Sequence, residues 1–563
     1  MLSDTKLLLL QQLVHNASKE EIIWTEGYLA GFLDAQQPIA IQPASKGTSL
    51  KPVVIYGTET GNSKKVASRI LTTFKKNKIN AKTVDVFQYD IDKLQKETLA
   101  LFVMSTQGEG EFPQNAVAFY EKLKVSDADL STLKFAVLAL GDSSYPLYCN
   151  AGILLDETLE RLGAQRILPL LTADVDYADV VASWEIQLQQ FFENDGAAAI
   201  NTNNAAIQPT PIKKNYKGVI SHKVILNDRG SSKETWHIEI TTADEVAYEP
   251  GDALGVFAKN DSVSIQKVIN YFSEDPKRIV KIKDREAPIG EWLAERNIKG
   301  LSKRLLEQVS DLLGIATLEE KADLLDILEQ NQIPENIGIH SLLELLLPIA
   351  PRLYSVSSST EAHDGQVHLT VSVNRFIVGD QIKTGLASQF LADYPVNTEL
   401  EFYIHKNTNF KLPSEDTDII MIGPGTGIAP FRSFLSHRDA TGAEGKNWLF
   451  FGEQHFVLDF YYQTEIQEWI ATGVLNRFDP AFSRDQQHKI YVQDRIRENA
   501  KEFNRWLERG ATLYVCGQKH PMSTDVENTI IEIIASEQNT SIEKAKVFLE
   551  TLETSGRYQK DVY

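Results

Sequence analysis

The pattern of apolar and polar positions changes character along the 563-residue chain. Between residues 51 and 195, short continuous apolar runs at 53–56, 101–104 and 135–140 alternate with stretches that have helical spacing. Continuous apolar strands separated by helices are typical of a parallel sheet that is covered on both faces. We therefore expect a doubly wound α/β domain over 51–195.

The middle of the chain follows a different period. Residues 217–260 and 351–410 alternate apolar and polar positions with Gly and Pro breaks, as in HLTVSVNRF at 368–376. A period of two indicates half-buried strands, so we expect an antiparallel β-barrel domain over 213–412. The Leu-rich stretch at about 261–350 has helical spacing and is interpreted as a helical insertion into this domain.

Strand–helix alternation returns over 413–563, with the runs DIIMIG, NWLFFG and TLYVCG. This pattern predicts a second, Rossmann-like parallel-sheet domain. Two segments fall outside the three domains. Residues 1–50 are interpreted as short helices, and residues 196–212 are uncharged, small and Pro-rich at their end, which is typical of a flexible linker.

Composition and charge narrow the possible functions. The formal net charge of −20 argues against a nucleic-acid partner but permits a basic protein partner. No apolar run approaches the roughly 20 residues of a membrane helix, so we expect no membrane segment. Cys149 and Cys516 are the two cysteines. They lie far apart with no CxxC, which favours a reducing cytoplasm and predicts no iron–sulfur cluster or other metal site.

Three polar loops follow the apolar runs of the first domain: 57–63, 105–111 and 140–145. The first is a hydroxyl-rich turn before a helix, where backbone N–H groups and the helix dipole suit a phosphate. It lacks Gly-Lys-Ser/Thr, so it is not a nucleoside triphosphatase loop, although an ordinary capped helix start would look similar. All three loops leave the carboxyl ends of strands, where open α/β sheets bind ligands.

Taken together, the loops TxTGN, STQGEGE and LGDSSY resemble those of flavodoxins, which implies FMN. The first loop would hold the phosphate, and Tyr145 would stack on the ring. Gln107 stands where some relatives have an aromatic residue, so one ring face would be less covered. The implied FMN-binding residues are Thr58, Glu59, Thr60, Gly61, Asn62, Ser63, Ser105, Thr106, Gln107, Gly108, Leu140, Gly141, Asp142, Ser143, Ser144, Tyr145, Pro146, Leu147, Tyr148 and Cys149.

The barrel region carries a second set of motifs. Its RLYS run at 352–355 resembles the RxYS motif of ferredoxin–NADP reductases, in which Arg binds the FAD pyrophosphate, Tyr stacks on the ring and Ser reaches its nitrogen edge. The turn at 384–388 resembles the second phosphate turn of that family. The implied FAD-binding residues are Arg352, Leu353, Tyr354, Ser355, Thr370, Val371, Ser372, Phe376, Gly385, Leu386, Ala387, Ser388 and Tyr563.

The loop GPGTGIAP at 423–430 is similar to the nicotinamide-side pyrophosphate loop of the same reductases. Arg484 alone could form a surface salt bridge, but with Lys489 it matches the family's 2′-phosphate site, which favours NADPH over NADH. The implied NADP-binding residues are Gly425, Thr426, Ser483, Arg484, Lys489, Ile490, Tyr491, Val492, Gln493 and Asp525.

The catalytic assignment rests on the same resemblance. Cys516 by itself would most simply be a buried apolar residue. The family places this Cys near the nicotinamide, where it would act with Ser355 and Asp561 in hydride transfer. The terminal Tyr563 would cap the FAD ring and leave it when the nicotinamide enters.

The order of domains identifies residues 50–563 as a member of the diflavin reductase family. SRDQ, YVQD and the ending RYQKDVY resemble its assimilatory sulfite reductase branch. This resemblance implies electron transfer from NADPH through FAD and FMN to a sirohaem/iron–sulfur subunit that reduces sulfite to sulfide. The segment GYLAGFL at 27–33 implies a homo-oligomer.

Other functions stay open at this point. One is a stand-alone diflavin reductase for another haem or a small-molecule acceptor, and another is a non-catalytic flavin-binding module. Residues 101–195 contain 15 Asp and Glu against 5 Lys and Arg. Acidic side chains near the proposed flavin loops would steer a basic partner toward the cofactor, although a generally acidic surface would account for them too.

Overall fold

The computed structural model describes residues 51–563 except 60, 109, 144, 146, 176, 194–213, 284, 317–321, 333, 335 and 379. The predicted N-terminal helical segment and the predicted linker lie outside the described residues, as do Thr60, Ser144 and Pro146 of the predicted FMN site. The residues Lys51–Tyr563 belong to one compact unit. No described helix is both long enough and apolar enough to cross a membrane.

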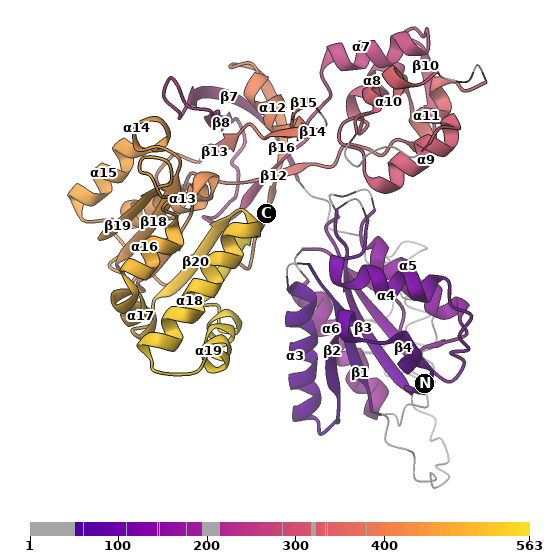
Figure 1. Cartoon of the computed structure of the whole chain (residues 1–563), viewed down its shortest axis with the longest axis horizontal. Helices are drawn as coiled ribbons and strands as arrows, with labels where there is room; N and C mark the ends of the chain where they lie inside the picture. Colours follow the sequence, from indigo (N-terminus) through magenta and orange to yellow (C-terminus); the bar gives the residue numbers. More distant parts are fainter. Residues whose placement is uncertain are drawn as a thin grey trace, which may run out of the picture. The chain divides into compact units, whose positions relative to one another are not determined.

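The first described part, here the flavodoxin-like module, is a parallel sheet between two helix layers. Its strands run in the order β2-β1-β3-β4-β5, with β6 also paired to β4. Helix α3 packs beside α6, and α4 packs beside α5 (Figure 1). The elements are β1 (Val53–Gly57), α3 (Asn62–Lys76), β2 (Lys82–Asp85), η1 (Val86–Gln88), η2 (Ile91–Lys96), β3 (Leu99–Ser105), α4 (Gln114–Lys124), β4 (Lys134–Leu140), α5 (Asn150–Arg161), β5 (Gln165–Arg166), β6 (Leu171–Ala173) and α6 (Ala178–Glu193). The predicted doubly wound sheet is confirmed.

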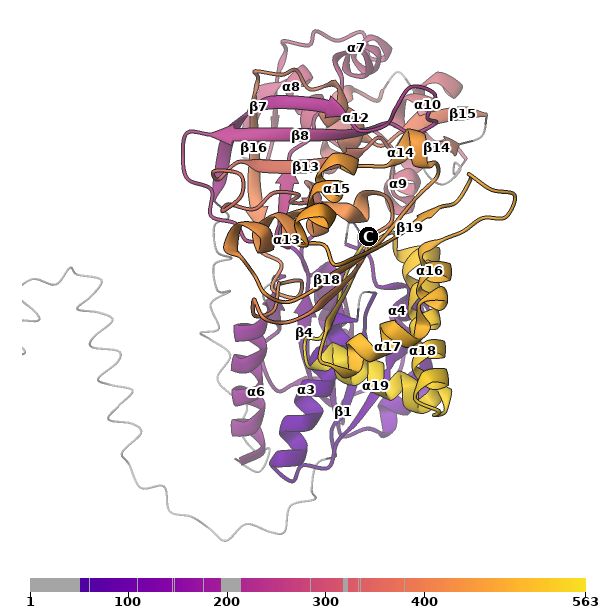
Figure 2. The same ribbon diagram turned by 90° about the vertical axis from the view of Figure 1, so that its left-hand side faces the viewer.

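The second part, the barrel module, is an antiparallel sheet in the order β12-β9-β16-β7-β8-β13. Figure 2 shows β16, β7, β8 and β13 side by side. A bridge between Val356 and Leu369 joins the two end strands and closes the barrel. The strands are β7 (Asn215–Ile225), β8 (Thr235–Thr242), β9 (Ala253–Val256), β12 (Arg352–Ser355), β13 (Val367–Ser372) and β16 (Glu399–His405). The hairpin β14 (Arg375–Val378) and β15 (Gln381–Thr384) precedes α12 (Leu386–Asp393).

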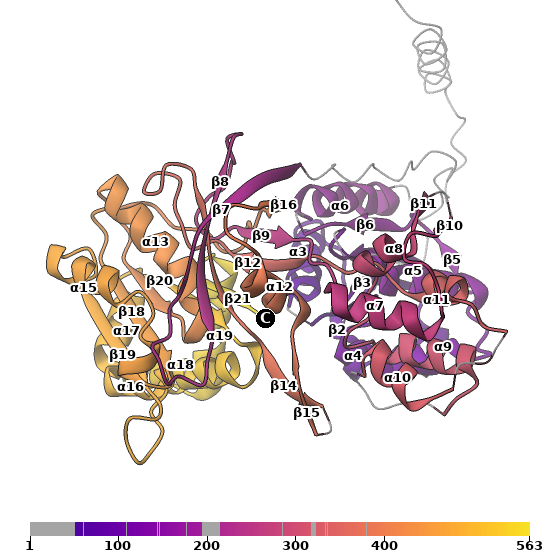
Figure 3. The ribbon, with the colours of Figure 1, turned by 90° about the horizontal axis from the view of Figure 1, so that it is seen from above.

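The helical insertion lies between β9 and β12 in the chain and has its own apolar core. It contains α7 (Ser262–Tyr271), α8 (Ile289–Glu295), α9 (Lys303–Leu313), α10 (Leu324–Gln330) and α11 (Ile339–Leu345), which form one group in Figures 1 and 3. The short hairpin of β10 (Ile279–Ile282) and β11 (Arg285–Pro288) is an addition that the helical spacing did not predict.

The third part, the C-terminal module, is a parallel sheet in the order β19-β18-β17-β20-β21. Successive residues of β17 point to opposite faces: Ile420 and Ile422 pack under the helices α16 to α19, whereas Ile419 and Met421 pack under α13 and α15. The elements are β17 (Ile419–Ile422), η4 (Gly425–Gly427), α13 (Ile428–Thr441), β18 (Asn447–Glu453), α14 (Phe456–Asp459), α15 (Gln463–Thr472), β19 (Arg477–Phe482), α16 (Val492–Glu498), α17 (Ala500–Glu508), β20 (Thr512–Gly517), η5 (Lys519–Ser523), α18 (Thr524–Glu537), α19 (Ile542–Thr554) and β21 (Tyr558–Val562).

Candidate active site

The turn between β1 and α3 has the features of a phosphate site. Gly61 has a φ of 89° and donates its N–H to Thr58 Oγ1 at 2.9 Å. Ser63, in the first turn of α3, is fully buried, and its hydroxyl has no hydrogen-bond partner among the described residues. A buried hydroxyl without a partner is costly, and a helix N-terminus attracts anions. The turn therefore fits the FMN phosphate.

The two other predicted loops meet this turn at the same end of the sheet. Ser105 donates its hydroxyl to the Gly57 carbonyl at 3.2 Å, and the Thr106 N–H donates to the Leu140 carbonyl at 2.9 Å. These bonds tie the ends of β1, β3 and β4 together. The structure thus brings the described residues of the predicted FMN loops to one place.

Individual side chains in these loops have distinct surroundings. Burial raises the pKa of Tyr145, the predicted stacking residue, whereas Gln107 is exposed. Cys149 is fully buried and donates its thiol to the Ala139 carbonyl at 3.3 Å. Burial raises its pKa to about 12, so Cys149 is a packed thiol and not a reactive one.

The predicted second FAD phosphate turn opens helix α12. The Ser388 hydroxyl accepts from the Asn374 N–H at 3.1 Å and donates to the Gly385 carbonyl at 3.0 Å. This hydroxyl is therefore committed to the turn itself. Backbone N–H groups of the first turn of α12 are the donors that would be left for a phosphate.

Strand β13 separates its predicted FAD residues onto two faces. Val371 points into the barrel core. The Thr370 hydroxyl lies 2.6 Å from the Tyr462 hydroxyl, and the Ser372 hydroxyl accepts from Thr235 at 3.2 Å. The two hydroxyls are thus engaged with other side chains, and a role of Thr370 and Ser372 in FAD binding would fall to other atoms of these residues.

Ser355, Cys516 and Asp561 come together although they are far apart in the chain. Strands β20 and β21 pair with Cys516 opposite Asp561. Ser355 at the end of β12 donates its hydroxyl to Asp561 Oδ2 at 2.7 Å, and Cys516 Sγ lies 3.9 Å from the same oxygen. Burial raises the pKa of Asp561, and burial and the nearby carboxylate raise the pKa of Cys516. Cys516 is therefore a neutral thiol beside the half-buried carboxyl group of Asp561.

The glycine-rich loop after β17 lies directly against this centre. A Cβ on Gly427 would come within 2.2 Å of the Cys516 carbonyl oxygen, so only glycine allows the loop to approach so closely. The Thr426 hydroxyl lies 2.6 Å from the hydroxyl of the terminal Tyr563. Residues predicted for the FAD site and for the nucleotide site therefore touch.

The predicted 2′-phosphate residues occupy the segment between β19 and α16. Arg484 and Lys489 are exposed, and neither has an ion-pair partner among the described residues. The described part of the segment shows Ser483 bonded through its N–H to the Glu453 carbonyl at 2.8 Å, and Tyr491 as the N-cap of α16. Val492 is buried, Gln493 is half-buried, and Asp525 lies in the first turn of α18. The two charges are available to an anion.

One pair near the loop was missed by sequence reasoning. Glu453 is buried at the end of β18, and its carboxylate pairs with Lys233 of the barrel module. A Cβ on Gly425 would lie 3.6 Å from Glu453 Oε1, so the carboxylate adjoins the glycine-rich loop. Lys233 neutralises a negative charge that would otherwise repel a diphosphate. The acidic end of the run NWLFFGE was the available signal.

The fold and these sites define the class. A flavodoxin-like module joined to a barrel with an RxYS strand and to a parallel-sheet nucleotide module is the organisation of a diflavin reductase. Family models agree: the flavodoxin model matches residues 54–184, the FAD binding domain model 208–315 and 295–390, and the oxidoreductase NAD-binding domain model 421–528.

Relatives identify the branch. The sulfite reductase (NADPH) flavoprotein alpha-component of Bacillus subtilis is 38% identical, with 99% of this chain and 97% of the relative covered. Those of Cronobacter sakazakii and Escherichia coli O157:H7 are each 36% identical, with 100% of this chain and 98% of each relative covered. The chain belongs to this family of flavoprotein alpha-components. It is an NADPH-dependent flavoprotein oxidoreductase that uses FMN, FAD and NADPH.

Proposed function

We propose that the chain is the flavoprotein component of an assimilatory sulfite reductase. It would pass electrons from NADPH through FAD and FMN to a sirohaem/iron–sulfur subunit that reduces sulfite to sulfide. The observation that carries the proposal is the Ser355–Asp561–Cys516 centre against the glycine-rich loop. Bound FAD would accept two electrons as hydride and FMN would release them singly, which matches a two-electron donor to a one-electron haem acceptor.

Each side chain of this centre has a proposed task. Cys516 would lie beside the nicotinamide as a neutral thiol, with its orientation held by Asp561. Ser355, fixed by the same carboxyl group, would present its oxygen to the flavin edge. Tyr563 would move away from Thr426 when NADPH enters, because its hydroxyl contacts the Thr426 hydroxyl in the proposed diphosphate loop.

Further proposals concern binding and assembly. Thr58 and Ser63 would hold the FMN phosphate, Arg352 the FAD pyrophosphate, and Arg484 and Lys489 the 2′-phosphate.

The exposed Glu111 and Asp179 lie near the proposed flavin loops and support docking of a basic haem partner there. Segment 27–33 would assemble the chain into a homo-oligomer, and the compartment would be the cytoplasm.

One experiment tests the central proposal. The purified chain should carry FAD and FMN in equal amounts and should reduce cytochrome c with NADPH. Sulfide should form from sulfite only when a sirohaem/iron–sulfur subunit is added. Cytochrome c reduction without sulfide formation in the complete mixture would favour the alternative, a stand-alone diflavin reductase for another acceptor.

The linker proposed at 196–212 gives a second test. If it lets the FMN domain face FAD first and the haem partner next, shortening it by about half should slow haem reduction while FAD reduction by NADPH stays intact. A linker of the original length with a shuffled sequence is the control. Unchanged haem reduction in the shortened chain would make domain movement through this linker unnecessary.

A further inference from the structure

Two adjacent residues of helix α13 bond across to the barrel module. Arg432 donates to the Ser357 carbonyl at 2.7 Å, and Ser433 donates its hydroxyl to the Ser358 carbonyl. Ser357 follows Ser355 of the proposed hydride-transfer centre by two residues. The same helix begins at Ile428, directly after the glycine-rich loop. A short bonded path therefore connects the proposed FAD strand with the proposed diphosphate loop.

All three nitrogens of the Arg432 guanidinium donate hydrogen bonds. Arg432 is only 5% exposed, and its Nε and Nη2 each donate to Glu465 at 2.7 Å. Its Nη1 also donates to His368 Nδ1 at 3.1 Å. Burial and the Arg432 charge lower the pKa of His368 to about 2, so the ring is neutral and accepts this bond. Because the planar guanidinium is hydrogen-bonded to Glu465, Ser357 and His368, its position and orientation are fixed.

A second contact between the C-terminal module and the barrel module lies at Thr370, two residues after His368 on strand β13. In the β8–β13 pair, His237 lies opposite Thr370 and Glu239 opposite His368. The hydroxyl of Tyr462, from the C-terminal module, lies 2.6 Å from that of Thr370 and 3.1 Å from His237 Nδ1. We call Arg432, Tyr462, His237, His368 and Thr370 the polar seam. It joins the C-terminal module to a strand predicted to bind FAD.

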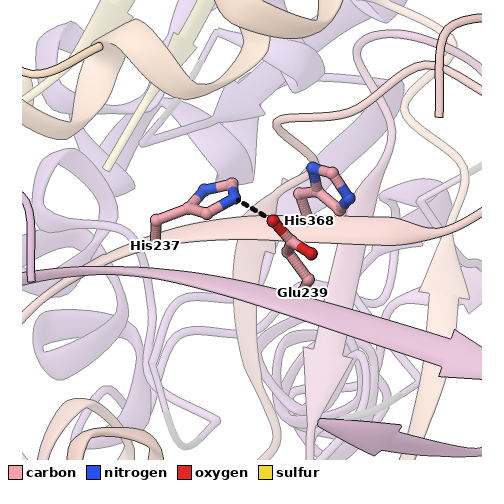
Figure 4. A group of neighbouring side chains, drawn as sticks. All are labelled: His237, Glu239 and His368. Atoms are coloured by element: carbon pink, nitrogen blue, oxygen red, sulfur yellow. Dashed lines mark hydrogen bonds and ion pairs between the residues drawn. The ribbon is translucent and has the colours of Figure 1, made fainter. Parts of the chain in front are cut away.

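His237, Glu239 and His368 also resemble a metal ligand set, because their ligand atoms lie within 4.8 Å of one another (Figure 4). However, every ring nitrogen is already bonded: those of His237 to Tyr462 and Glu239, and those of His368 to Arg432 and Gln366. A cation would have to break one of these bonds beside a buried guanidinium. The geometry favours a hydrogen-bonded seam over a metal site.

We propose that the polar seam, and Arg432 in particular, sets the distance between the nicotinamide and the flavin during hydride transfer. Arg432 is a positioning residue, because it acts through Ser357 and helix α13 and not on the reacting atoms. The proposal rests on the proposed hydride-transfer centre. A displacement of about 1 Å at a reacting centre costs about a hundredfold in rate, so a joint that fixes one module on the other matters to the chemistry.

The test is Arg432→Lys in the full chain with both flavins. Lysine keeps the charge opposite Glu465 but cannot bond Glu465, Ser357 and His368 together. The rate of FAD reduction at saturating NADPH should fall at least about tenfold, while the Kd for NADP+ stays within about twofold of wild type. The primary deuterium isotope effect with NADPH labelled at the transferred position should become more dependent on temperature.

The matched control is Arg438→Lys. Arg438 is on the same helix and is as deeply buried, but it donates to the Thr417 and Gly445 carbonyls within its own module. It should lower thermal stability as Arg432→Lys does while leaving hydride transfer unchanged. Tyr462→Phe, which removes one hydroxyl and leaves no charge unpaired, should slow FAD reduction with the same change in isotope effect if Arg432→Lys does not fold.

The possible results distinguish failure of the proposed hydride-transfer centre from failure of the positioning role of Arg432. Wild-type FAD that NADPH does not reduce would refute the hydride-transfer centre itself. Normal wild-type reduction with unchanged rates in Arg432→Lys and Tyr462→Phe, or with an equal loss in Arg438→Lys, would overturn the positioning role alone. Binding of one Zn²⁺ per chain that is lost in His237→Gln would also overturn it, because the cluster would then be a metal site.

Discussion

At the scale of single residues, we propose that two cations set the preference for NADPH over NADH. Arg484 and Lys489 are exposed cations without an ion-pair partner in the described part of the chain. Most of the other arginines nearby are committed: Arg495 and Arg497, for example, pair with Glu498 and Asp494. An unpaired charge keeps its full attraction for a phosphate, because no internal carboxylate competes for it.

We predict that Arg484→Ala weakens the binding of NADPH far more than the binding of NADH. Loss of a hydrogen bond to a charged group costs about 1.5–3 kcal/mol, which corresponds to roughly 10- to 150-fold in KM. The KM for NADH should stay within about twofold, because NADH has no 2′-phosphate. Steady-state cytochrome c reduction measures both values. Arg509→Ala, another exposed arginine of the same module, should change neither, and an equal loss for both nucleotides would remove Arg484 from the site.

These cations and the glycine-rich loop could be proposed from the sequence because each belongs to a contiguous motif. It could not reach the contact between Cys516 and Asp561 by physical argument. That contact depends on the register of β20 with β21, and parallel register is set by the packing of the whole sheet. The three residues of this centre were assigned by resemblance alone. Lys233 and Glu453 were missed for the same reason, since a barrel loop and a strand end meet only in the folded chain.

At the scale of elements, the strand periods predicted the barrel but not what covers it. The polar residues His237 and Glu239 alternate along β8, as His368 and Thr370 do along β13, which normally indicates a solvent-facing side. His237, His368 and Thr370 are nevertheless buried, because the C-terminal module lies over them. The available sign of a covered polar face was that three of its four polar side chains are histidine or threonine, with Glu239 as the one charged residue among them.

The two seam histidines predict a pH dependence of stability. Burial and Arg432 lower the pKa of His237 to about 3 and that of His368 to about 2. His222 and His363 also face both rings. The unfolded chain binds protons at a pKa of about 6.5, whereas the folded rings stay neutral. The contribution of the two neutral rings to the free energy of unfolding should therefore be fully present above about pH 6.5. It should be lost as the pH falls, so that the free energy of unfolding decreases by about 2 kcal/mol per ring at pH 5.

The measurement compares urea unfolding of wild type and His368→Gln at pH 7 and pH 5. Glutamine can still accept a hydrogen bond from Arg432, and the variant should lose about 2 kcal/mol less than wild type between the two pH values. His488→Gln, at an exposed position, should lose as much as wild type. If His368→Gln also does so, the folded His368 takes up its proton at an ordinary pH.

At the scale of the whole molecule, the modules are connected by charges from opposite ends of the chain. Lys519 donates to both the backbone carbonyl and the side chain of Glu59, each at 2.9 Å, and Lys65 lies 3.4 Å from Glu553. Glu59 belongs to the proposed FMN phosphate turn, and the Lys519 N–H donates to the carbonyl of Tyr563 at 2.9 Å. Tyr563, which we propose caps the FAD ring, is thus bonded to Lys519, the residue that contacts the flavodoxin-like module. No local sequence pattern connects positions so far apart.

We predict that Lys519→Gln weakens this contact and slows electron transfer from FAD to FMN. Partly exposed ion pairs contribute about 0.2–1 kcal/mol, so the rate measured by rapid mixing should fall by up to about fivefold. Salt screens such pairs, and the same transfer in wild type should slow as ionic strength rises. The variant should respond less to salt, while Lys501→Gln, at an exposed position of the same module, should behave as wild type. A variant with the wild-type rate and salt dependence would show that the Lys519–Glu59 contact does not hold the modules together for electron transfer.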